Sequence, residues 1–330
     1  EWRVDHEEFH MERLPEVDLD FRTGYAFLSD QKVVYQNLLS AQQYIFHDGS
    51  FTQLHSTEKV DCGAFTYGKY TFKYSLEKGK IQACEAKKPS MCINVDIQLG
   101  SWPYAYTEKN GAVLALTNYG DALIFRDDKW CRTVMRNDIY SCMPNAPMVV
   151  EPKGIQFYSS VKYNDRSLVG EWPTGRIYEF DGTVLKPSEI SPPRFSSGTP
   201  DGYEAQSMAN FCGDLFVGYW PHGEILRRDS QTGKWSLFAR LFSTPSKEQS
   251  FIPYSNRPAD EVDNSFYGQR ITALVPYDDA LYVATSNLRN WGNHIKPHFL
   301  SKEDISEYGA AYKITAQGCK TYRTQSNTTR

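Results

Sequence analysis

A segment that occurs twice constrains the fold of this chain more than any other feature. Residues 167–177 read SLVGEWPTGRI and residues 215–225 read LFVGYWPHGEI, so the pattern returns after about 50 residues. Each copy is an alternating apolar run, a Pro-Gly turn and a second alternating run, which is typical of a β-hairpin. The chain is therefore expected to be built from repeated antiparallel units.

Related units lie before and after these two copies. A weaker copy runs through 112–127, and a fourth begins at 280–287 and resumes at 311–314 after an expanded loop. The segments 25–54 and 64–95 divide in the same way, without the Trp-Pro turn. A further short strand is predicted before each of the four hairpins, at 104–107, 155–160, 205–211 and 271–275. Units of roughly 40 to 60 residues with four short strands are the sequence signature of β-propeller blades.

We therefore predict an all-β fold, a single β-propeller domain over residues 1–330 with about six four-stranded blades, five or seven being the alternatives. Residues 1–22 would form an N-terminal extension or a closing strand, and 288–309 a loop inserted in the last blade. Short helical turns are expected only at 11–14 and 302–308. A two-sheet β-sandwich is the competing fold, but sandwiches seldom show such repeats.

Charge and hydropathy exclude two classes of partner. The formal net charge is −4 and the isoelectric point is about 6.0, whereas nucleic-acid-binding surfaces are strongly basic. No run approaches the roughly 20 apolar residues that span a bilayer. We expect a monomer that binds neither nucleic acid nor membrane.

The cysteines favour secretion. Cys84 and Cys92, and Cys131 and Cys142, have separations that allow disulfides between neighbouring strands or hairpin ends. Seven cysteines are present, so at least one thiol is left over, and the candidates are Cys62, Cys212 and Cys319. Asn327 begins an Asn-Thr-Thr glycosylation acceptor. These features predict a secreted glycoprotein with disulfide bonds.

Blade geometry predicts one functional face. In a propeller, the loop that enters the first strand of a blade shares a face with the turn between its second and third strands. Polar and aromatic side chains suited to a ring-shaped, hydroxylated ligand occur at both places. The residues predicted to bind substrate are Trp102, Tyr104, Asn118, Trp172, Glu204, Gln206, Trp220, Gln269, Asn287 and His294.

A structural role competes with the functional one for several of these residues. Trp172 and Trp220 occupy equivalent repeat positions, where they would pack between blades. Arg270 would form a buried ion pair with Glu204. The 288–309 loop, which carries His294, would fold over the face as a lid.

Two short motifs have the spacing of metal ligands, but their surroundings argue against a metal site. The HEEFH run at 6–10 matches a zinc-protease pattern, but it lies at the start of the chain with no long helix to carry it. Pro297 breaks the helix that would align His294 with His298. We expect no cofactor, with calcium at the oxygen-rich cluster Asp260, Glu261, Asp263 and Asn264 as the alternative to a solvated loop. Serine-hydrolase, Walker and dinucleotide motifs are missing from the sequence.

The motifs YEAQ at 203–206, WPHG at 220–223 and YGQRITALVP at 267–276 together resemble secreted β-propeller proteins of uncharacterised function, over about the last two blades. More loosely, the architecture is similar to the propeller-fold polysaccharide lyases that degrade acidic glycans. That resemblance implies Arg, His and Tyr on one propeller face and transfers no catalytic residue.

Three classes of function follow. The first is a secreted glycan-active enzyme, a lyase on uronate polysaccharide: Arg270 would neutralise the carboxylate, His222 would act as base, and Tyr203 or Tyr267 would protonate the departing oxygen. A hydrolase would instead need Glu204 paired with Glu171 or Asp201. The second is a lectin-like binding propeller without catalysis. The third is an enzyme on a small molecule, either a calcium-dependent lactonase or a cofactor-independent, oxygen-using enzyme of luciferase type.

Overall fold

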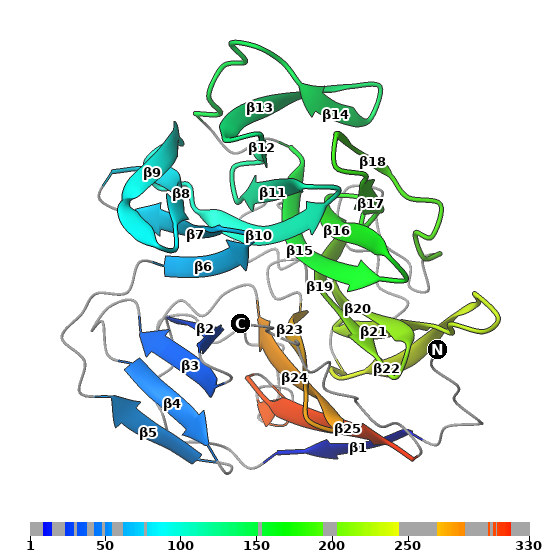
Figure 1. The fold of residues 1–330 in the computed structure, drawn as a ribbon. Helices are drawn as coiled ribbons and strands as arrows, with labels where there is room; N and C mark the ends of the chain where they lie inside the picture. Colours follow the sequence, from blue (N-terminus) through cyan, green and yellow to red (C-terminus); the bar gives the residue numbers. More distant parts are fainter. Residues whose placement is uncertain are drawn as a thin grey trace, which may run out of the picture. The chain divides into compact units, whose positions relative to one another are not determined.

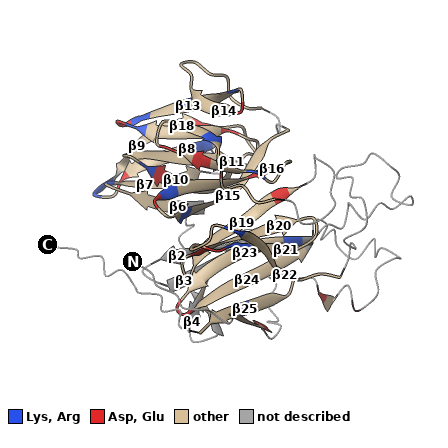
Figure 2. Cartoon of the chain, turned by 90° about the vertical axis from the view of Figure 1, so that its right-hand side faces the viewer, with Lys and Arg blue, Asp and Glu red and all other residues tan. Residues whose placement is uncertain are grey.

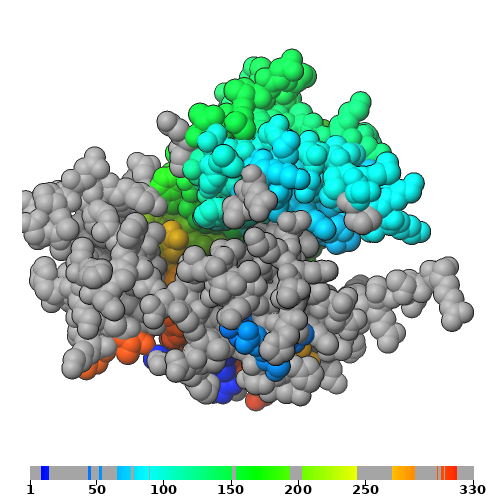
Figure 3. All heavy atoms as spheres, turned by 90° about the vertical axis from the view of Figure 1, so that its left-hand side faces the viewer, coloured from blue at the N-terminus to red at the C-terminus, as the bar shows by residue number. Residues whose placement is uncertain are grey.

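The computed structural model describes thirteen stretches of the chain: residues 9–14, 24–29, 32–37, 43–47, 50–54, 62–75, 78–150, 154–193, 203–243, 269–287, 303, 306–307 and 309–317. Figure 3 shows one face of the chain, with the residues whose side chains are described in colour. Several predictions concern residues outside these stretches: Tyr267, His294, the acidic cluster at 260–264, the loop at 288–300, and Asn327.

The chain divides into two compact units. One comprises residues 1–16, 104–127 and 131–330, and the other residues 17–103 and 128–130. All elements with described bounds are β-strands (Figure 1).

The unit of residues 17–103 holds two antiparallel four-stranded sheets in which strands pair in chain order. The first sheet comprises β2 (Gly24–Ser29), β3 (Lys32–Asn37), β4 (Gln43–His47) and β5 (Ser50–Leu54), and the second β6 (Cys62–Tyr67), β7 (Tyr70–Ser75), β8 (Lys80–Glu85) and β9 (Lys88–Asp96). Cys84 and Cys92 lie opposite each other on β8 and β9 and form a disulfide.

The larger unit repeats the same four-stranded pattern. Its first two sets are β10 (Pro103–Lys109), β11 (Ala112–Thr117), β12 (Ala122–Arg126) and β13 (Lys129–Arg136), then β15 (Gln156–Tyr163), β16 (Arg166–Trp172), β17 (Ile177–Phe180) and β18 (Val184–Pro187). An additional strand, β14 (Ile139–Cys142), pairs with both β13 and β18 and joins these sets into one nine-stranded sheet. The sequence analysis did not predict β14.

The remaining two sheets complete the larger unit. One is β19 (Glu204–Phe211), β20 (Asp214–Trp220), β21 (Glu224–Arg228) and β22 (Trp235–Arg240), and the other is β23 (Gln269–Tyr277), β24 (Ala280–Asn287), β25 (Ala311–Ala316) and β1 (Phe9–Arg13). The repeated hairpins are confirmed, because β16 pairs with β17 and β20 with β21 on either side of the two Trp-Pro turns. The fold is thus the all-β propeller class that the repeat predicts, and the number of blades stays a prediction.

The N-terminal helical turn predicted at residues 11–14 is wrong. This segment belongs to β1, which pairs with β25 from Phe9↔Ala316 to Arg13↔Tyr312. Such a short segment is a poor isolated helix, whereas pairing satisfies its backbone groups, and Phe9 packs edge-on against Phe216 and Phe238. In the second predicted helical turn, the described residues Glu303 and Ser306 are helical.

The core of the larger unit lies between neighbouring sheets. One cluster joins Phe216 of β20 to Leu281 and Ile314 of the next sheet, and another joins Leu168 of β16 to Val217 of β20. Alternating strand residues therefore bury their side chains against the following sheet, which is how propeller blades pack.

Glycine permits the closest approach between sheets. A Cβ atom added at Gly218 of β20 would lie 2.5 Å from Cβ of Ile271 and 2.5 Å from Oγ of Ser207. Gly170, the matching residue of β16, meets Ala205 of the next sheet in the same way. The glycine at this repeat position is therefore explained by the passage of the neighbouring innermost strand.

Serine hydroxyls tie the innermost strands together. Ser159 Oγ of β15 donates to the carbonyl of Ala205 on β19 over 3.0 Å, and Ser207 Oγ of β19 donates to the carbonyl of Ile271 on β23 over 2.6 Å. Both hydrogen bonds are buried, so each carries weight in the packing of one sheet on the next.

The Ser207 bond gives a test of this packing. We expect Ser207→Ala to lower the free energy of unfolding by about 1 to 2 kcal/mol, because the buried Ile271 carbonyl loses its donor. Urea unfolding measures the change, and Ser236→Ala at an exposed site of β22 is the control with a near-zero effect. Equal stabilities of the two variants would contradict the prediction.

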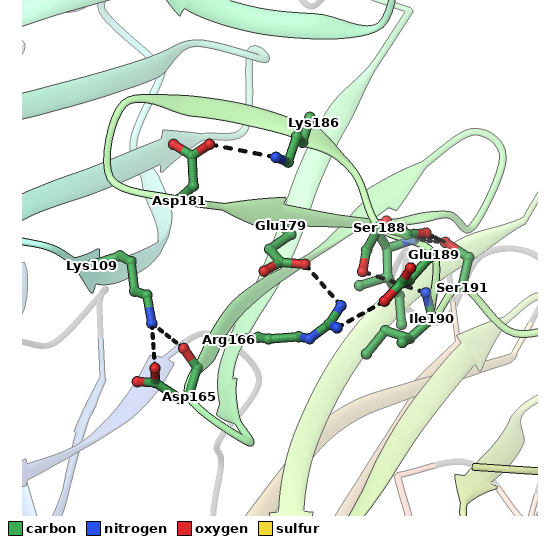
Figure 4. A network of polar contacts seen from close by, with 11 residues as sticks. Lys109, Asp165, Arg166, Glu179, Asp181, Lys186, Ser188, Glu189, Ile190 and Ser191 are labelled. Atoms are coloured by element: carbon green, nitrogen blue, oxygen red, sulfur yellow. Dashed lines mark hydrogen bonds and ion pairs between the residues drawn. The ribbon is translucent and has the colours of Figure 1, made fainter.

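Several charged groups in the described part of the larger unit are paired near its surface. Lys109 Nζ lies 3.0 Å from Asp165 Oδ2, and Arg166 bridges Glu179 at 3.1 Å and Glu189 at 2.8 Å (Figure 4). Both signs of charge are interspersed along the described strands (Figure 2). Exposed pairs of this kind contribute little to stability, and they do not form a site.

The disulfide bonds reduce the number of candidates for the unpaired cysteine. Cys131 and Cys142 form a second disulfide. Cys212 is also disulfide-bonded, so its place among the candidates for the unpaired cysteine was wrong, and Cys62 and Cys319 remain. Among the described residues, no helix is long and apolar enough to cross a membrane.

Candidate functional site

Three neighbouring innermost strands carry a β-bulge at the same repeat position. The register shifts between Phe157 and Ser159 in β15, between Ala205 and Ser207 in β19, and between Ile271 and Ala273 in β23. The residues at the bulges are Tyr158, Gln206 and Thr272. Bulges change the direction of side chains and are frequent beside functional sites. The three sheets therefore share a feature that redirects a side chain near the start of the innermost strand.

A second set of equivalent residues lies two residues before those at the bulges. Gln156 pairs with Trp172, Glu204 with Trp220, and Arg270 with Ser286. The repeat thus places an amide, a carboxylate and a guanidinium at the same register position of adjacent sheets. The backbone arrangement is repeated, but each strand carries a different functional group at this position.

These residues meet in a group that we call the inner-strand cluster, namely Gln156, Tyr158, Glu204 and Arg270. Arg270 Nη2 lies 3.2 Å from Glu204 Oε2, so the pair that competed with a functional role in the sequence analysis is formed. The guanidinium carbon of Arg270 is 5.9 Å from the ring centre of Tyr158. Tyr158 donates its hydroxyl to Gln156 Oε1 over 2.7 Å. Three sheets therefore contribute to one polar cluster.

Burial sets the electrostatics of the cluster. The side chain of Glu204 is fully buried, whereas that of Arg270 is 20% exposed. Burial raises the pKa of Glu204, and the opposing effects of Arg270 and of the nearby Tyr158 hydroxyl are smaller. A carboxyl of this kind holds a proton more readily than an exposed one, which is a property of acid–base groups. Arg270 and the half-buried Gln156 and Tyr158 give the cluster its access to solvent.

Aromatic rings flank the cluster. The ring of Tyr104, which is 41% exposed, lies 5.1 Å from the ring of Tyr158. Trp172 is half-buried at the end of β16. Such surfaces suit the apolar face of a sugar ring.

The structure brings the Trp-Pro turns and the segment before β19 together, as the face argument predicts. The amide of Tyr203 donates to the carbonyl of Pro173 over 2.8 Å, and Thr174 forms a bridge with Tyr203. Tyr203 stacks on Tyr219 with ring centres 4.4 Å apart and donates its hydroxyl to Glu224 Oε2 over 3.2 Å. Tyr203 is 3% exposed, so in this structure its side chain holds the turns in place.

His222 and Trp220 are enclosed. Both side chains have no exposed surface. Arg240 covers His222, with Nε donating to the His222 carbonyl over 3.2 Å and Nη2 lying 3.5 Å from Nδ1. The two Trp-Pro turns therefore differ, because Trp172 is accessible and Trp220 is packed.

The other predicted residues are placed as follows. Asn118 is half-buried in the turn between β11 and β12. Gln269 and Asn287 pair across β23 and β24, and their side chains lie outside the described part. Trp102 is 44% exposed and belongs to the unit of residues 17–103.

Gln156 and Tyr158 were missed by the sequence analysis. A signal for Gln156 was present, because it stands as far before Trp172 as Glu204 does before Trp220. Tyr158 gave none, since its role depends on a bulge that strand patterns do not reveal. In the part of the chain that the structure describes, no group of three His, Cys, Asp or Glu side chains could hold a metal ion.

Glu171 stabilises the Trp172 turn. Its carboxylate, 1% exposed, accepts the hydroxyl of Thr174 at 2.6 Å and the amides of Thr174 and Arg176 at 3.3 Å. Burial raises its pKa above the ordinary 4.5, although these hydrogen bonds and the charge of Arg176 oppose the rise. The hydrolase pairing of Glu171 with Glu204 therefore uses a carboxylate that already binds its own turn.

The raised pKa of Glu171 predicts a pH dependence. Between 4.5 and the raised pKa, the folded state binds more protons than the unfolded state, so this residue's contribution to stability falls as pH rises through that window. Relative to Glu171→Gln, the parent protein should therefore lose stability from acid to neutral pH. Urea unfolding across pH measures it, with the exposed Glu189→Gln as control. A difference that is independent of pH would be the contrary result.

Comparison with known proteins gives distant structural likenesses. No family model and no curated protein matches the chain. Virginiamycin B lyase from Staphylococcus aureus, in a catalytically inactive form with quinupristin, is 16% identical with a TM-score of 0.46, covering 93% of this chain and 99% of that one. The PQQ-bound aldose sugar dehydrogenase of Streptomyces coelicolor is 12% identical with a TM-score of 0.47, covering 94% and 99%. An exported protein of Bacteroides fragilis is 13% identical with a TM-score of 0.45, covering 93% and 94%. The activities of these proteins are not transferred to this chain.

Proposed function

We propose that this chain is a secreted glycan-active enzyme, a lyase that cleaves uronate-containing polysaccharide at the inner-strand cluster. The observation that carries the proposal is the Arg270–Glu204 pair, in which a partly exposed guanidinium is held by a fully buried carboxylate at 3.2 Å beside the ring of Tyr158. A guanidinium has five N–H donors in a planar fork. Arg270 can therefore bind a substrate carboxylate while Glu204 holds it in place.

The cluster has the groups that β-elimination requires. Binding of the uronate carboxylate to Arg270 would stabilise the negative charge that develops when the C5 proton leaves. The proton passes from C5 to the Tyr158–Glu204 pair, the C5 electron pair forms the C4–C5 double bond, and the C4–O bond breaks. The departing oxygen takes a proton from the same pair, so the step needs no oxidant or reductant.

Tyr158 is an acid–base candidate in addition to the residues proposed from the sequence. Its hydroxyl lies in the cluster, and the pKa of Glu204 is raised by burial, so together they can store and return a proton. The assignments of His222 as base and of Tyr203 or Tyr267 as acid stay predictions. With His222 enclosed under Arg240, that role would require the turn to open.

The difference between the two Trp-Pro turns favours one site over several. A lectin that repeats its sites would expose both Trp172 and Trp220, but Trp220 has no exposed surface. Trp172 with Tyr104 and Tyr158 would form a single sugar platform beside Arg270.

A screen of the purified protein against acidic and neutral polysaccharides tests the proposal. We expect ultraviolet absorbance of the unsaturated uronide to appear only with acidic polymers and to be unaffected by a metal chelator. Binding without absorbance would move the protein to the lectin class. Turnover of lactones that a chelator abolishes would instead support the calcium-dependent class.

Secretion is part of the same proposal. Two disulfides, Cys84–Cys92 and Cys131–Cys142, and the bonded Cys212 support an oxidising compartment. Expression in an oxidising compartment should give a protein in which only the leftover cysteine is alkylated before reduction and all seven are alkylated after it. A fully active protein that reacts at all seven cysteines before reduction would contradict this.

A further inference from the structure

One buried acceptor at the bulges has no hydrogen-bond partner among the described residues. The Gln206 side chain is half-buried, and its Oε1 atom is buried and receives no hydrogen bond there. Burial of an amide oxygen without a donor is costly, and most buried side-chain oxygens are satisfied. An acceptor left open in a folded protein therefore calls for an explanation.

The position of Gln206 in the fold suggests why its oxygen has no donor. Gln206 holds the bulge of β19, the register position that Tyr158 holds in β15. Its own strand carries Glu204, the carboxylate of the inner-strand cluster, two residues earlier. On both sides, the innermost strands are fixed by the buried bonds from Ser159 to Ala205 and from Ser207 to Ile271. The strand that presents Gln206 is thus held firmly between the strands of Tyr158 and Arg270.

The adjacent sheet provides a contrast. Gln156 is the same residue type on β15, and its Oε1 accepts the Tyr158 hydroxyl at 2.7 Å. The chain therefore satisfies one glutamine of this region internally and leaves the other without a donor. A purely structural glutamine would be expected to resemble Gln156.

We propose that Gln206 is a specificity-determining residue whose side-chain carbonyl accepts a hydrogen bond from a ligand hydroxyl, while Arg270 binds an acidic group of the same ligand. This inference rests on the proposed function and names the residue that would bind a hydroxyl of the uronate ring. A ligand with the acid but no hydroxyl leaves the Gln206 oxygen buried and unsatisfied. One with hydroxyls but no acid gains nothing from Arg270. Sites that hydrogen-bond a ligand hydroxyl discriminate strongly against analogues that lack it.

The first arm of the test uses the protein without ligand. Gln206→Met has nearly the same length as glutamine and removes the open acceptor, so the thermal midpoint should rise by about 2 °C. Gln156→Met removes a satisfied acceptor and should lower the midpoint. A Gln206→Met variant that is no more stable than the parent protein would overturn the inference, whatever ligand is bound.

The second arm measures binding of three probes by calorimetry: D-glucuronate, D-glucose and cyclohexanecarboxylate. The parent protein should prefer D-glucuronate, and Gln206→Met should weaken that binding by about 10-fold or more while leaving cyclohexanecarboxylate unchanged. Equal loss for both acids would overturn the hydroxyl role. If the parent protein instead binds D-glucose as tightly as D-glucuronate and Gln206→Met weakens both, the uronate proposal fails and the ligand-facing role of Gln206 stands.

Discussion

Arg270→Ala is expected to reduce kcat/KM on uronate polysaccharide by at least about 100-fold. The substitution removes the only cation of the inner-strand cluster, and loss of a preorganised charge at the reacting group typically costs this much or more. It also leaves Glu204 buried without its 3.2 Å partner. The pKa of Glu204, already raised by burial, should rise further because the positive charge that lowers it is removed.

Two further variants separate the role of charge from that of folding. Arg270→Lys keeps the charge but loses the planar fork, and it should recover only part of the activity. Glu204→Gln keeps the shape of the buried side chain but removes both the ionic partner of Arg270 and the carboxyl that would exchange the C5 proton, so it should lower kcat as well as raise KM. Circular dichroism checks that each variant is folded. Full activity of a folded Arg270→Ala would remove the cluster from the mechanism.

Gly218→Ala is expected to lower the free energy of unfolding by about 3 kcal/mol. The new Cβ would lie 2.5 Å from Cβ of Ile271 and from Oγ of Ser207. Both neighbours are attached close to the backbone of innermost strands, so relief requires β19 and β23 to shift rather than a side chain to rotate. Forcing a methyl group into a packed core costs on this order.

Gly154→Ala is the matched control for this prediction. A Cβ at Gly154 meets nothing within 4 Å, and its φ is not in the left-handed region. Its free energy of unfolding should therefore change by less than about 0.5 kcal/mol. Urea unfolding of both variants gives the comparison, and an equal change in the two would show that the contact between sheets is not tight.

The order of the strands could be predicted from the sequence because it depends on patterns of neighbouring residues. Alternating apolar residues and Pro-Gly turns specify hairpins at short range, and copies of one hairpin can stack only as repeated sheets. The strands at 155–160, 205–211 and 271–275 were therefore found before the structure. Residues 11–14 were misassigned because their strand is fixed by a partner, β25, about 300 residues away in the chain.

Part of the candidate site also followed from sequence. Glu204, Gln206 and Arg270 were predicted because they stand where the chain enters central strands, and the structure places Glu204 and Arg270 at equivalent positions of β19 and β23. Their neighbours Gln156 and Tyr158 were harder to predict, since the alternation of apolar and polar residues does not reveal the β-bulge at Tyr158. The enclosure of His222 and Trp220 depends on Arg240 and on the packing of the next sheet, so the turn motif alone suggested exposure.

The sequence by itself determined the repeated four-stranded units, their hairpin turns and the residue types available at each repeat position, because these depend on neighbouring residues and on periodicity. Only the tertiary structure decided which equivalent residues are accessible and which are sealed. Burial depends on side chains from other sheets, and it makes Glu204 a holder of Arg270, Trp220 a packing residue and Gln206 an open acceptor.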